Sequence, residues 1–272
     1  MRWLKKEGQV ILNRPDELDK EDSLRLTQTS LEQIYVNAEF RELFSFFQDI
    51  NYIHLIPQLI RQPELFFNTS ISMAEDAYGF HFMEKILKTP KNQRNSRLKK
   101  IEQALQIAVP QLTNLSESRD INGIPHLEAK YEHWRPNAGK QQESQFSDGT
   151  IRLIGLLWSV LENKSLLLLE EPELSLHPAI VKKIPLILYN LTKSRNRTTQ
   201  IILSTHSPDL LSDQSIAAKE LILLSPQKEG TDAVNAGNIH EVRALLESGL
   251  SPDEVVITYV SPKNVEQLNL FS

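Results

Sequence analysis

The sequence contains no cysteine and no long uninterrupted run of apolar residues. Without cysteine the chain cannot form disulfides or thiolate metal sites, which fits a reducing compartment. A membrane-spanning helix needs roughly 18 consecutive apolar residues, and no stretch reaches that length. Residues 1–6 are not followed by the apolar run of a secretory signal peptide. We therefore expect a cytoplasmic protein without a membrane segment.

Paired histidines and an excess of positive charge are also missing. The seven histidines are scattered, and no two have the i, i+4 spacing of a helical zinc site. The formal net charge of −5 argues against nucleic-acid binding by the whole surface, although it permits a local basic patch. Residues 85–100 hold seven Lys and Arg side chains. A solvated helix start is the plainer interpretation of this run, and contact with a phosphate backbone, which leaves DNA as a partner, is the alternative.

What is present is an ordinary globular composition, with 40% hydrophobic and 24% charged residues over 272 positions. In the first part of the chain we predict a strand over residues 9–12, helices over 24–34 and 39–47, and a buried strand that starts at residue 51. Pro57 should end that strand, because proline cannot donate to the hydrogen-bond ladder.

From residue 145 the pattern changes to strands alternating with helices. We predict helices over residues 147–161, 179–191 and 208–211, and strands over residues 166–169, 201–204 and 220–224. The first of these strands is continuously apolar, which is typical of a parallel sheet covered on both faces. The pattern indicates an α/β fold, in which ligands bind beyond the carboxyl ends of the strands.

Two adjacent carboxylates, Glu170 and Glu171, follow the first of these strands, and Pro172 stops it. A nucleoside triphosphate site needs one carboxylate for Mg²⁺ and a second to orient or deprotonate the attacking water. Neighbouring residues at a strand end point in different directions, so the two glutamates could serve these two partners. The plain alternative is an acidic turn after a core strand.

Two further segments carry polar residues at the starts of predicted helices. His206 follows the strand over residues 201–204, with Ser207 as the expected N-cap and Pro208 at the first helical position. Its imidazole could donate a hydrogen bond to a terminal phosphate. Ahead of the apolar helix that starts near residue 147 stand three residues that could form an anion site with free backbone N–H groups: Ser147, Asp148 and Gly149. Each feature alone is explained by helix capping, but their order and spacing together favour phosphate chemistry.

Three segments resemble motifs of ABC-type ATPases of the RecF/SMC/OLD kind, specifically the AAA-type core domain proteins. "FSDGTIRL" resembles the signature loop, "LLLLEEPELSLHP" the Walker B strand with the D-loop, and "LSTHSPDLL" the switch histidine segment. The resemblance is strongest over residues 145–213. It implies a P-loop NTPase-like ABC ATPase core with a helical subdomain, the cofactors ATP and Mg²⁺, and ATP hydrolysis by a dimer in DNA repair or genome defence.

The resemblance also implies residue roles. Glu170 takes the Mg²⁺ position of the Walker B motif, which is usually aspartate in ABC ATPases and commonly glutamate in this branch. Glu171 is the catalytic base, and His206 senses the γ-phosphate. Residues 174–177, which include His177, form the D-loop, and Gln58 takes the place of the Q-loop glutamine. Ser147 and Gly149 contact a γ-phosphate that the opposite subunit holds, and Asp148 belongs to the same cofactor-binding loop.

One element of the family is missing, the phosphate-binding loop G-x-x-x-x-G-K-[ST], or Walker A motif. The Gly139-Lys140 pair is the sole Gly-Lys in the sequence; Gln141 follows it, and Trp134 stands where the first glycine should be. We therefore expect an N-terminally incomplete ATPase that forms a homodimer, or a heterodimer with a Walker A-bearing chain. The alternative is a truncated, catalytically incompetent relative that acts as an interaction partner.

The ends of the chain complete the predicted organisation. Four parts are expected: the remainder of an N-terminal ATPase lobe (1–60), a helical or arm subdomain (61–144), the ATPase core (145–225), and a C-terminal helix and tail (226–272). In the tail, "QLNLF" resembles the pentapeptide by which bacterial polymerases and repair proteins bind the sliding clamp. Gln267 would be its polar anchor, and Leu268, Leu270 and Phe271 its apolar contacts. A tail that packs on its own domain is the alternative.

Overall fold

The structure is a computed structural model that describes residues 3–6, 9–13, 17–29, 31–33, 38–61, 76–132, 139–163, 165–193 and 200–260. The chain separates into two compact units, residues 1–51 and residues 52–272. Each unit is described by itself below. The four-part division predicted from the sequence stays a prediction.

The first unit combines a small hairpin with short helices. The order is β1 (Trp3–Lys6), β2 (Gln9–Asn13), α1 (Glu17–Glu21), the 3-10 helices η1 (Ser23–Thr27) and η2 (Ala38–Phe40), and α2 (Arg41–Gln48). The strand near residue 9 and the helix near residue 41 are confirmed. The helix predicted over residues 24–34 is wrong, because η1 ends at Thr27. Thr29 and Glu32 exchange side-chain to backbone hydrogen bonds of 2.5 and 3.3 Å, the pattern of a capping box, so Thr29 is a capping residue and does not lie inside a continuous helix.

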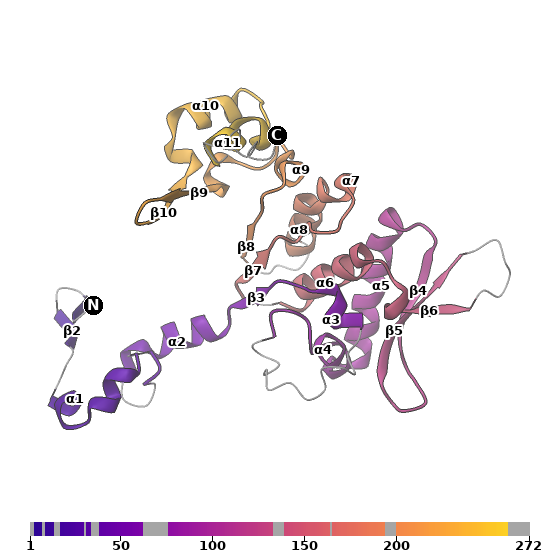
Figure 1. Cartoon of the computed structure of the whole chain (residues 1–272), viewed down its shortest axis with the longest axis horizontal. Helices are drawn as coiled ribbons and strands as arrows, with labels where there is room; N and C mark the ends of the chain where they lie inside the picture. Colours follow the sequence, from indigo (N-terminus) through magenta and orange to yellow (C-terminus); the bar gives the residue numbers. More distant parts are fainter. Residues whose placement is uncertain are drawn as a thin grey trace, which may run out of the picture. The chain divides into compact units, whose positions relative to one another are not determined.

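The central sheet of the second unit has the strand order β3-β7-β8 (Figure 1). Its strands are β3 (Asn51–Ile53), β7 (Leu167–Glu170) and β8 (Ile201–Ser204). β7 and β8 are parallel, with Leu167 opposite Ile201 and Glu170 opposite Ser204. The predicted α/β fold is therefore confirmed. The strand predicted from residue 51 is shorter than expected and is not buried, since β3 ends at Ile53 and its first two residues are exposed. Pro57 begins α3 (Pro57–Arg61).

The helices around this sheet are α6 (Asp148–Glu162), α7 (Pro178–Val181), α8 (Ile184–Lys193) and α9 (Pro208–Leu211). The single helix predicted over residues 179–191 is two helices, and the break falls at residues 182–183. Pro185 explains it, since proline has no N–H and its ring would clash with the carbonyl of Val181. Proline is tolerated in the first turn of α8, where backbone N–H groups have no partner inside the helix.

α6 is the most deeply buried helix of the second unit. It lies beside α3, α5 (Lys91–Ala108) and α8, as Figure 1 shows. Helices contact α6 on several sides and cover its apolar side chains. Ile154, Leu157 and Trp158 are each about 1% exposed. This explains why its sequence is almost wholly apolar. The start of α6, by contrast, lies at the candidate site.

An antiparallel sheet that the sequence did not predict follows α4 (Phe82–Lys88) and α5. It has the order β4-β5-β6, with β4 (Leu112–Arg119), β5 (Pro125–Tyr131) and β6 (Lys140–Gln142). The 3-10 helix η4 (Glu143–Gln145) leads from β6 into α6. The last strand of this sheet therefore leads, through η4, directly into the candidate signature loop.

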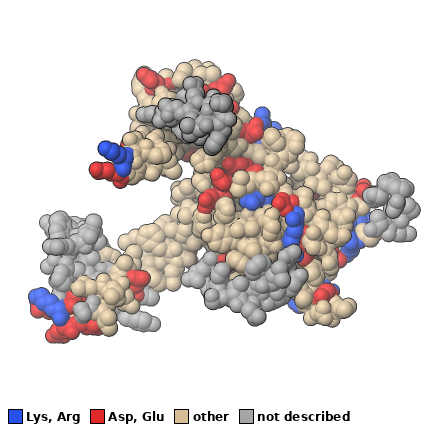
Figure 2. All heavy atoms as spheres, viewed as in Figure 1, with Lys and Arg blue, Asp and Glu red and all other residues tan. Residues whose placement is uncertain are grey.

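The basic run over residues 85–100 is only partly solvated. Arg94 is buried and its Nη2 lies 2.6 Å from Glu117 Oε1, and the buried Arg97 stacks over the Trp158 ring at 5.2 Å. These two arginines are structural, because they join α5 to β4 and to α6. Figure 2 shows Lys and Arg scattered over the visible face, without one continuous basic surface.

The C-terminal part of the second unit has a small hydrophobic cluster of its own. Its elements are η5 (Ala218–Glu220), β9 (Ile222–Gln227), β10 (Gly230–Asn235), η6 (Ala236–Asn238), α10 (His240–Glu247) and α11 (Pro252–Val260). β9 pairs with β10 as an antiparallel hairpin. The predicted strand over 220–224 thus exists but starts at Ile222. Within the described residues, no helix is both long and apolar enough to cross a membrane.

Candidate functional site

Glu170 and Glu171 lie at the carboxyl end of the parallel strand pair. Glu170 is the last residue of β7, whereas the strand predicted from the sequence ends at residue 169. It stands opposite Ser204 at the end of β8. The Glu171 N–H donates to the Ser204 carbonyl at 3.0 Å, and Glu171 has a φ of 41°. This left-handed conformation turns the chain sharply after the strand. The two adjacent carboxylates are therefore held next to the segment that leads to His206.

Two residues that sequence reasoning missed contact the Glu170 carboxylate. The Tyr52 hydroxyl, on β3, donates a hydrogen bond to Glu170 Oε2. His54 Nδ1 lies 3.9 Å from the same oxygen. No local pattern could have found this contact, because Tyr52 and Glu170 are 118 residues apart in the chain.

The segment after β8 is tied to the turn after β7. The Thr205 hydroxyl donates to Glu173 Oε1 and accepts a hydrogen bond from the Ser207 N–H at 2.9 Å. Ser207 occupies the N-cap position of α9, with Pro208 after it, but its side chain makes no capping bond. His206 lies between these anchored residues and is exposed to solvent. Sequence reasoning missed Glu173, which is only 9% exposed.

The turn over residues 172–175 leads into α7. Ser175 has a φ of 62°, and His177 caps α7 by accepting the Ala179 N–H on Nδ1 at 3.1 Å. His177 therefore has a structural use within this chain while its ring stays exposed. Its place at a dimer interface stays a prediction.

The candidate signature loop begins α6. Ser147 is the N-cap, and its Oγ accepts the Thr150 N–H at 3.1 Å. Asp148, the first helical residue, forms an ion pair of 2.6 Å with Arg61 and accepts a hydrogen bond from Gln58 at 3.3 Å. The expected Q-loop glutamine is thus in contact with the signature-like loop of its own chain.

Gly149 is required by close packing. A Cβ at this position would lie 2.7 Å from the backbone oxygen of Ser175. The loop at the start of α6 therefore packs directly against the turn that follows β7, and no side chain fits between them. This contact joins the candidate signature loop and the candidate D-loop within one chain.

A buried arginine lies one turn into α6. Arg152 is 7% exposed, and burial lowers the pKa of its guanidinium, while the carboxylates of Asp148, Glu171 and Glu173 act in the opposite direction. Its positive charge therefore faces acidic groups from both candidate loops. Its positive charge offsets part of the negative charge that these three carboxylates bring to the site.

The donor chemistry at the end of β7 fits Mg²⁺ in part. Carboxylate oxygens are the ligands that Mg²⁺ prefers, and the Glu170 side chain is 44% exposed and accessible. In the part of the chain that the structure describes, no group of three or more His, Asp or Glu side chains could hold a metal ion alone. Such a site suits Mg²⁺ that arrives with nucleotide phosphates and keeps several waters.

A parallel α/β sheet with an acidic pair at its carboxyl edge is the arrangement of an ATPase-type domain. Residues 4–212 match the family described as AAA domain, putative AbiEii toxin, Type IV TA system. The chain belongs to this family. No curated protein matches the chain.

Several solved structures of SMC head domains are similar to the chain at low identity. One, from work on ATP-driven dimerization and DNA-stimulated activation of SMC ATPases, is 16% identical with a TM-score of 0.40, over 59% of this chain and 93% of that one. The Smc head with coiled coil and joint from Pyrococcus yayanosii is 16% identical with a TM-score of 0.39, over 62% of this chain and 32% of that one. The Pyrococcus furiosus Smc head bound to the C-terminal domain of ScpA is 13% identical with a TM-score of 0.40, over 85% of this chain and 58% of that one. The chain thus spans less than two thirds of the last two.

Proposed function

We propose that this chain supplies catalytic elements to a composite ATPase site in which a second polypeptide holds the phosphates with its Walker A loop. The observation that carries the proposal is the bond from the Glu171 N–H to the Ser204 carbonyl, which brings the acidic pair next to the His206 segment. The 272 residues contain no G-x-x-x-x-G-K-[ST], so the proposal assigns the phosphate-binding loop to a polypeptide other than these residues.

The proposed roles follow from position. Glu170 holds Mg²⁺, which when bound neutralises charge on the phosphates. Glu171, which follows the strand in a left-handed turn, orients and deprotonates the attacking water. The exposed His206 donates a hydrogen bond to the γ-phosphate.

Ser147, Asp148 and Gly149 would face a γ-phosphate that the partner holds. The N-terminus of α6 presents backbone N–H groups and the positive end of a 15-residue helix. Asp148 would repel a phosphate by itself, but Arg61 pairs with it at 2.6 Å. The Arg61 ion pair therefore keeps this helix start suitable for an anion.

The biological setting is proposed from the family. Its description names a putative toxin of a toxin–antitoxin system, which favours genome defence, with DNA repair as the related setting. A heterodimer with a Walker A-bearing chain is the proposed assembly. A homodimer, the alternative, would have no Walker A loop among these 272 residues to hold the phosphates. Binding of a sliding clamp through Gln267, Leu268, Leu270 and Phe271 stays a proposal as well, and these residues lie outside the described part of the structure.

A complementation assay tests the composite site. The partner is a full-length member of this family that keeps its Walker A loop but carries an inactivating substitution in its own signature serine. Mixing it with this chain should restore ATP hydrolysis, because each chain supplies what the other lacks. If the mixture hydrolyses no more ATP than the partner alone, the proposal is refuted.

Ser147→Asp is the matched variant for this assay. Aspartate is a good N-cap, so α6 and the stability should be kept, while its charge repels the γ-phosphate. Restored hydrolysis should fall at least about 100-fold, the effect of losing one stabilising donor in a transition state. Ser144→Asp, an exposed position in η4, adds the same charge and should leave hydrolysis unchanged. Equal losses in both variants would show that the added charge acts nonspecifically.

Binding of ATP with Mg²⁺ to the chain alone is the second test. Without a phosphate cradle we expect no saturable binding at micromolar ATP by equilibrium dialysis. Micromolar affinity would show that another part of this chain holds the phosphates.

A further inference from the structure

We propose that Tyr52 and His54 are positioning residues that hold the Glu170 carboxylate where it binds a divalent cation. The inference rests on the proposed role of Glu170 as the metal ligand. Tyr52 and His54 are two residues apart on β3 and its continuation, so their side chains leave the strand on the same side. Both approach Glu170 Oε2, Tyr52 as a hydrogen-bond donor and His54 with Nδ1 at 3.9 Å.

The extra length of glutamate explains why such support is needed. Glu170 has one more methylene and one more rotatable bond than an aspartate would have at this position. Its side chain is 44% exposed, so packing alone does not fix it. Ordering a long polar side chain costs rotamer entropy. If Tyr52 orders the carboxylate in advance, metal binding does not have to.

His54 Nδ1 supports the same interpretation. This atom is buried, and within the described residues it has no hydrogen-bond partner. A buried polar atom without a hydrogen-bond partner lowers stability, so such an atom is rarely kept without a use. Its nearest ionic neighbour in the structure is the Glu170 carboxylate.

The backbone that carries His54 is fixed by the loop over residues 76–81. The His54 N–H donates to the Ala77 carbonyl at 2.8 Å, and the Ile56 N–H donates to the Tyr78 carbonyl at 3.0 Å. The Tyr78 ring also packs edge-on against the His54 ring, with the ring centres 6.2 Å apart. The position of His54 therefore depends on the conformation of this loop.

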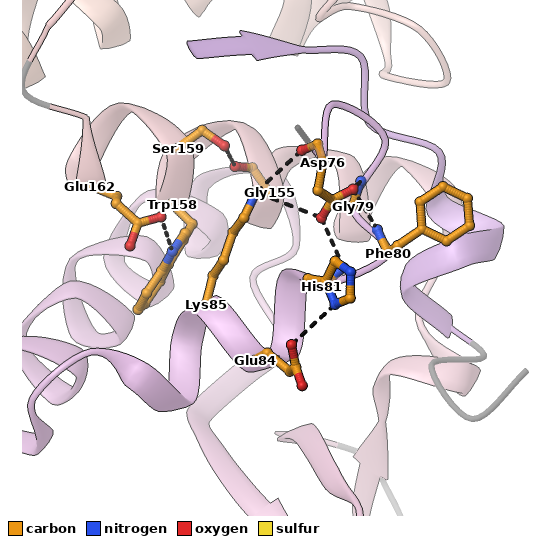
Figure 3. Close-up of polar contacts among 10 residues, drawn as sticks. All are labelled: Asp76, Gly79, Phe80, His81, Glu84, Lys85, Gly155, Trp158, Ser159 and Glu162. Atoms are coloured by element: carbon orange, nitrogen blue, oxygen red, sulfur yellow. Dashed lines mark hydrogen bonds and ion pairs between the residues drawn. The ribbon is translucent and has the colours of Figure 1, made fainter. Parts of the chain in front are cut away.

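Asp76 in turn fixes the loop. Its buried carboxylate accepts the backbone N–H groups of Gly79, Phe80 and His81 at 2.8, 2.9 and 2.8 Å, as Figure 3 shows. Lys85 Nζ lies 3.6 Å from the same carboxylate. The loop is thus closed around one anion, which leaves it little conformational freedom.

Leu55 packs the segment that carries His54 against α6. It is 6% exposed, and a Cβ on Gly155 of α6 would lie 2.3 Å from Leu55 Cδ1, so the two elements are in direct contact. The segment that presents His54 is therefore held between α6 and the loop over residues 76–81. A rigid support of this kind is what precise positioning of a ligand requires.

Mn²⁺ binding to the chain mixed with its Walker A-bearing partner and a non-hydrolysable ATP analogue tests the inference without an activity assay. Free Mn²⁺ is measured by electron paramagnetic resonance during titration of mixtures made with the wild type and with Tyr52→Phe, His54→Gln and Glu170→Gln. We expect Glu170→Gln to abolish the site, and Tyr52→Phe and His54→Gln to weaken it about 10-fold, the effect of losing an outer-shell partner. Tyr78→Phe is the matched control, because it keeps the ring that contacts His54, and it should bind as the wild type does.

A double-mutant cycle separates positioning from a merely structural role. Glu170→Asp is shorter and withdraws the carboxylate from the Tyr52 hydroxyl, so adding Tyr52→Phe to it should weaken Mn²⁺ binding no further. An equal loss in both backgrounds would overturn the inference. The inference would also be overturned if Tyr52→Phe and His54→Gln bound Mn²⁺ as tightly as the wild type does while Glu170→Gln abolished binding. In that case the proposed role of Glu170 as the metal ligand would still stand. If the wild type shows no Mn²⁺ site that depends on Glu170, the proposed metal role and the inference fall together.

Discussion

Replacing Asp76 by alanine should unfold the second unit at much lower denaturant concentration. Asp76 is 4% exposed, and its carboxylate accepts three backbone N–H groups at 2.8 to 2.9 Å. A hydrogen bond to a charged group contributes about 1.5–3 kcal/mol. The three share one acceptor group, and the opened loop can take up water, so they do not add fully. We expect a loss of about 3–5 kcal/mol, the cost of removing one partner from a buried charged network.

Urea unfolding followed by the fluorescence of Trp158 measures this loss. Trp158 is 1% exposed in the core of the second unit, and Trp3 and Trp134 are replaced by phenylalanine so that it reports alone. A single probe in one unit is needed, because two compact units need not unfold together. The same variant should lower the midpoint of thermal unfolding by roughly 6 to 20 °C, at about 2–4 °C per kcal/mol for a unit of this size.

Asp120→Ala is the matched control. Asp120 also accepts backbone N–H groups, from Asn122 at 2.9 Å and Ile124 at 2.7 Å, but in the half-exposed turn between β4 and β5. Water can replace it there, so we expect a loss below about 1.5 kcal/mol. If Asp76→Ala costs no more than Asp120→Ala, burial does not decide the strength of this loop anchor, and the account of its rigidity is wrong.

Three further predictions follow from burial and close packing. Gly149→Ala should destabilise the second unit by about 1–3 kcal/mol in urea unfolding, because the added Cβ would lie 2.7 Å from the Ser175 carbonyl oxygen. The better helix propensity of alanine offsets about 0.5–1 kcal/mol of this loss. Burial raises the pKa of Glu143 above 4.5, against the opposing effect of His126, so the folded state binds this proton more tightly than the unfolded chain does. As the pH rises from 4.5 through the raised pKa, the wild type should therefore lose stability relative to Glu143→Gln. The free energy of unfolding of both proteins is measured at several pH values, and a difference that does not change with pH would contradict this prediction. Leu169→Ala should cost about 2–5 kcal/mol by the same measurement, because Leu169 is 3% exposed at the centre of β7.

Local sequence patterns predicted the elements that depend on neighbouring residues. The apolar strand before Glu170 and the helix starts at Ser147 and Pro208 were found because caps, proline positions and apolar runs act over a few residues. The same reasoning failed for residues 24–34, where Thr29 and Glu32 bond to each other's backbone, and it missed the antiparallel sheet of β4, β5 and β6. Pairing between strands is set by long-range packing, which a short window of sequence does not contain.

The sequence by itself determined the order of the catalytic candidates: Ser147, then the adjacent Glu170 and Glu171, then His206. It also determined that no Walker A pattern stands among its 272 residues. Only the tertiary structure decided which groups surround them. The Tyr52 contact with Glu170, the Arg61 ion pair with Asp148 and the packing of Gly149 on Ser175 all join segments that are distant in the chain. The physical reason is that a side chain's partners depend on which strands and helices pack side by side, and that is settled only when the whole unit buries its core.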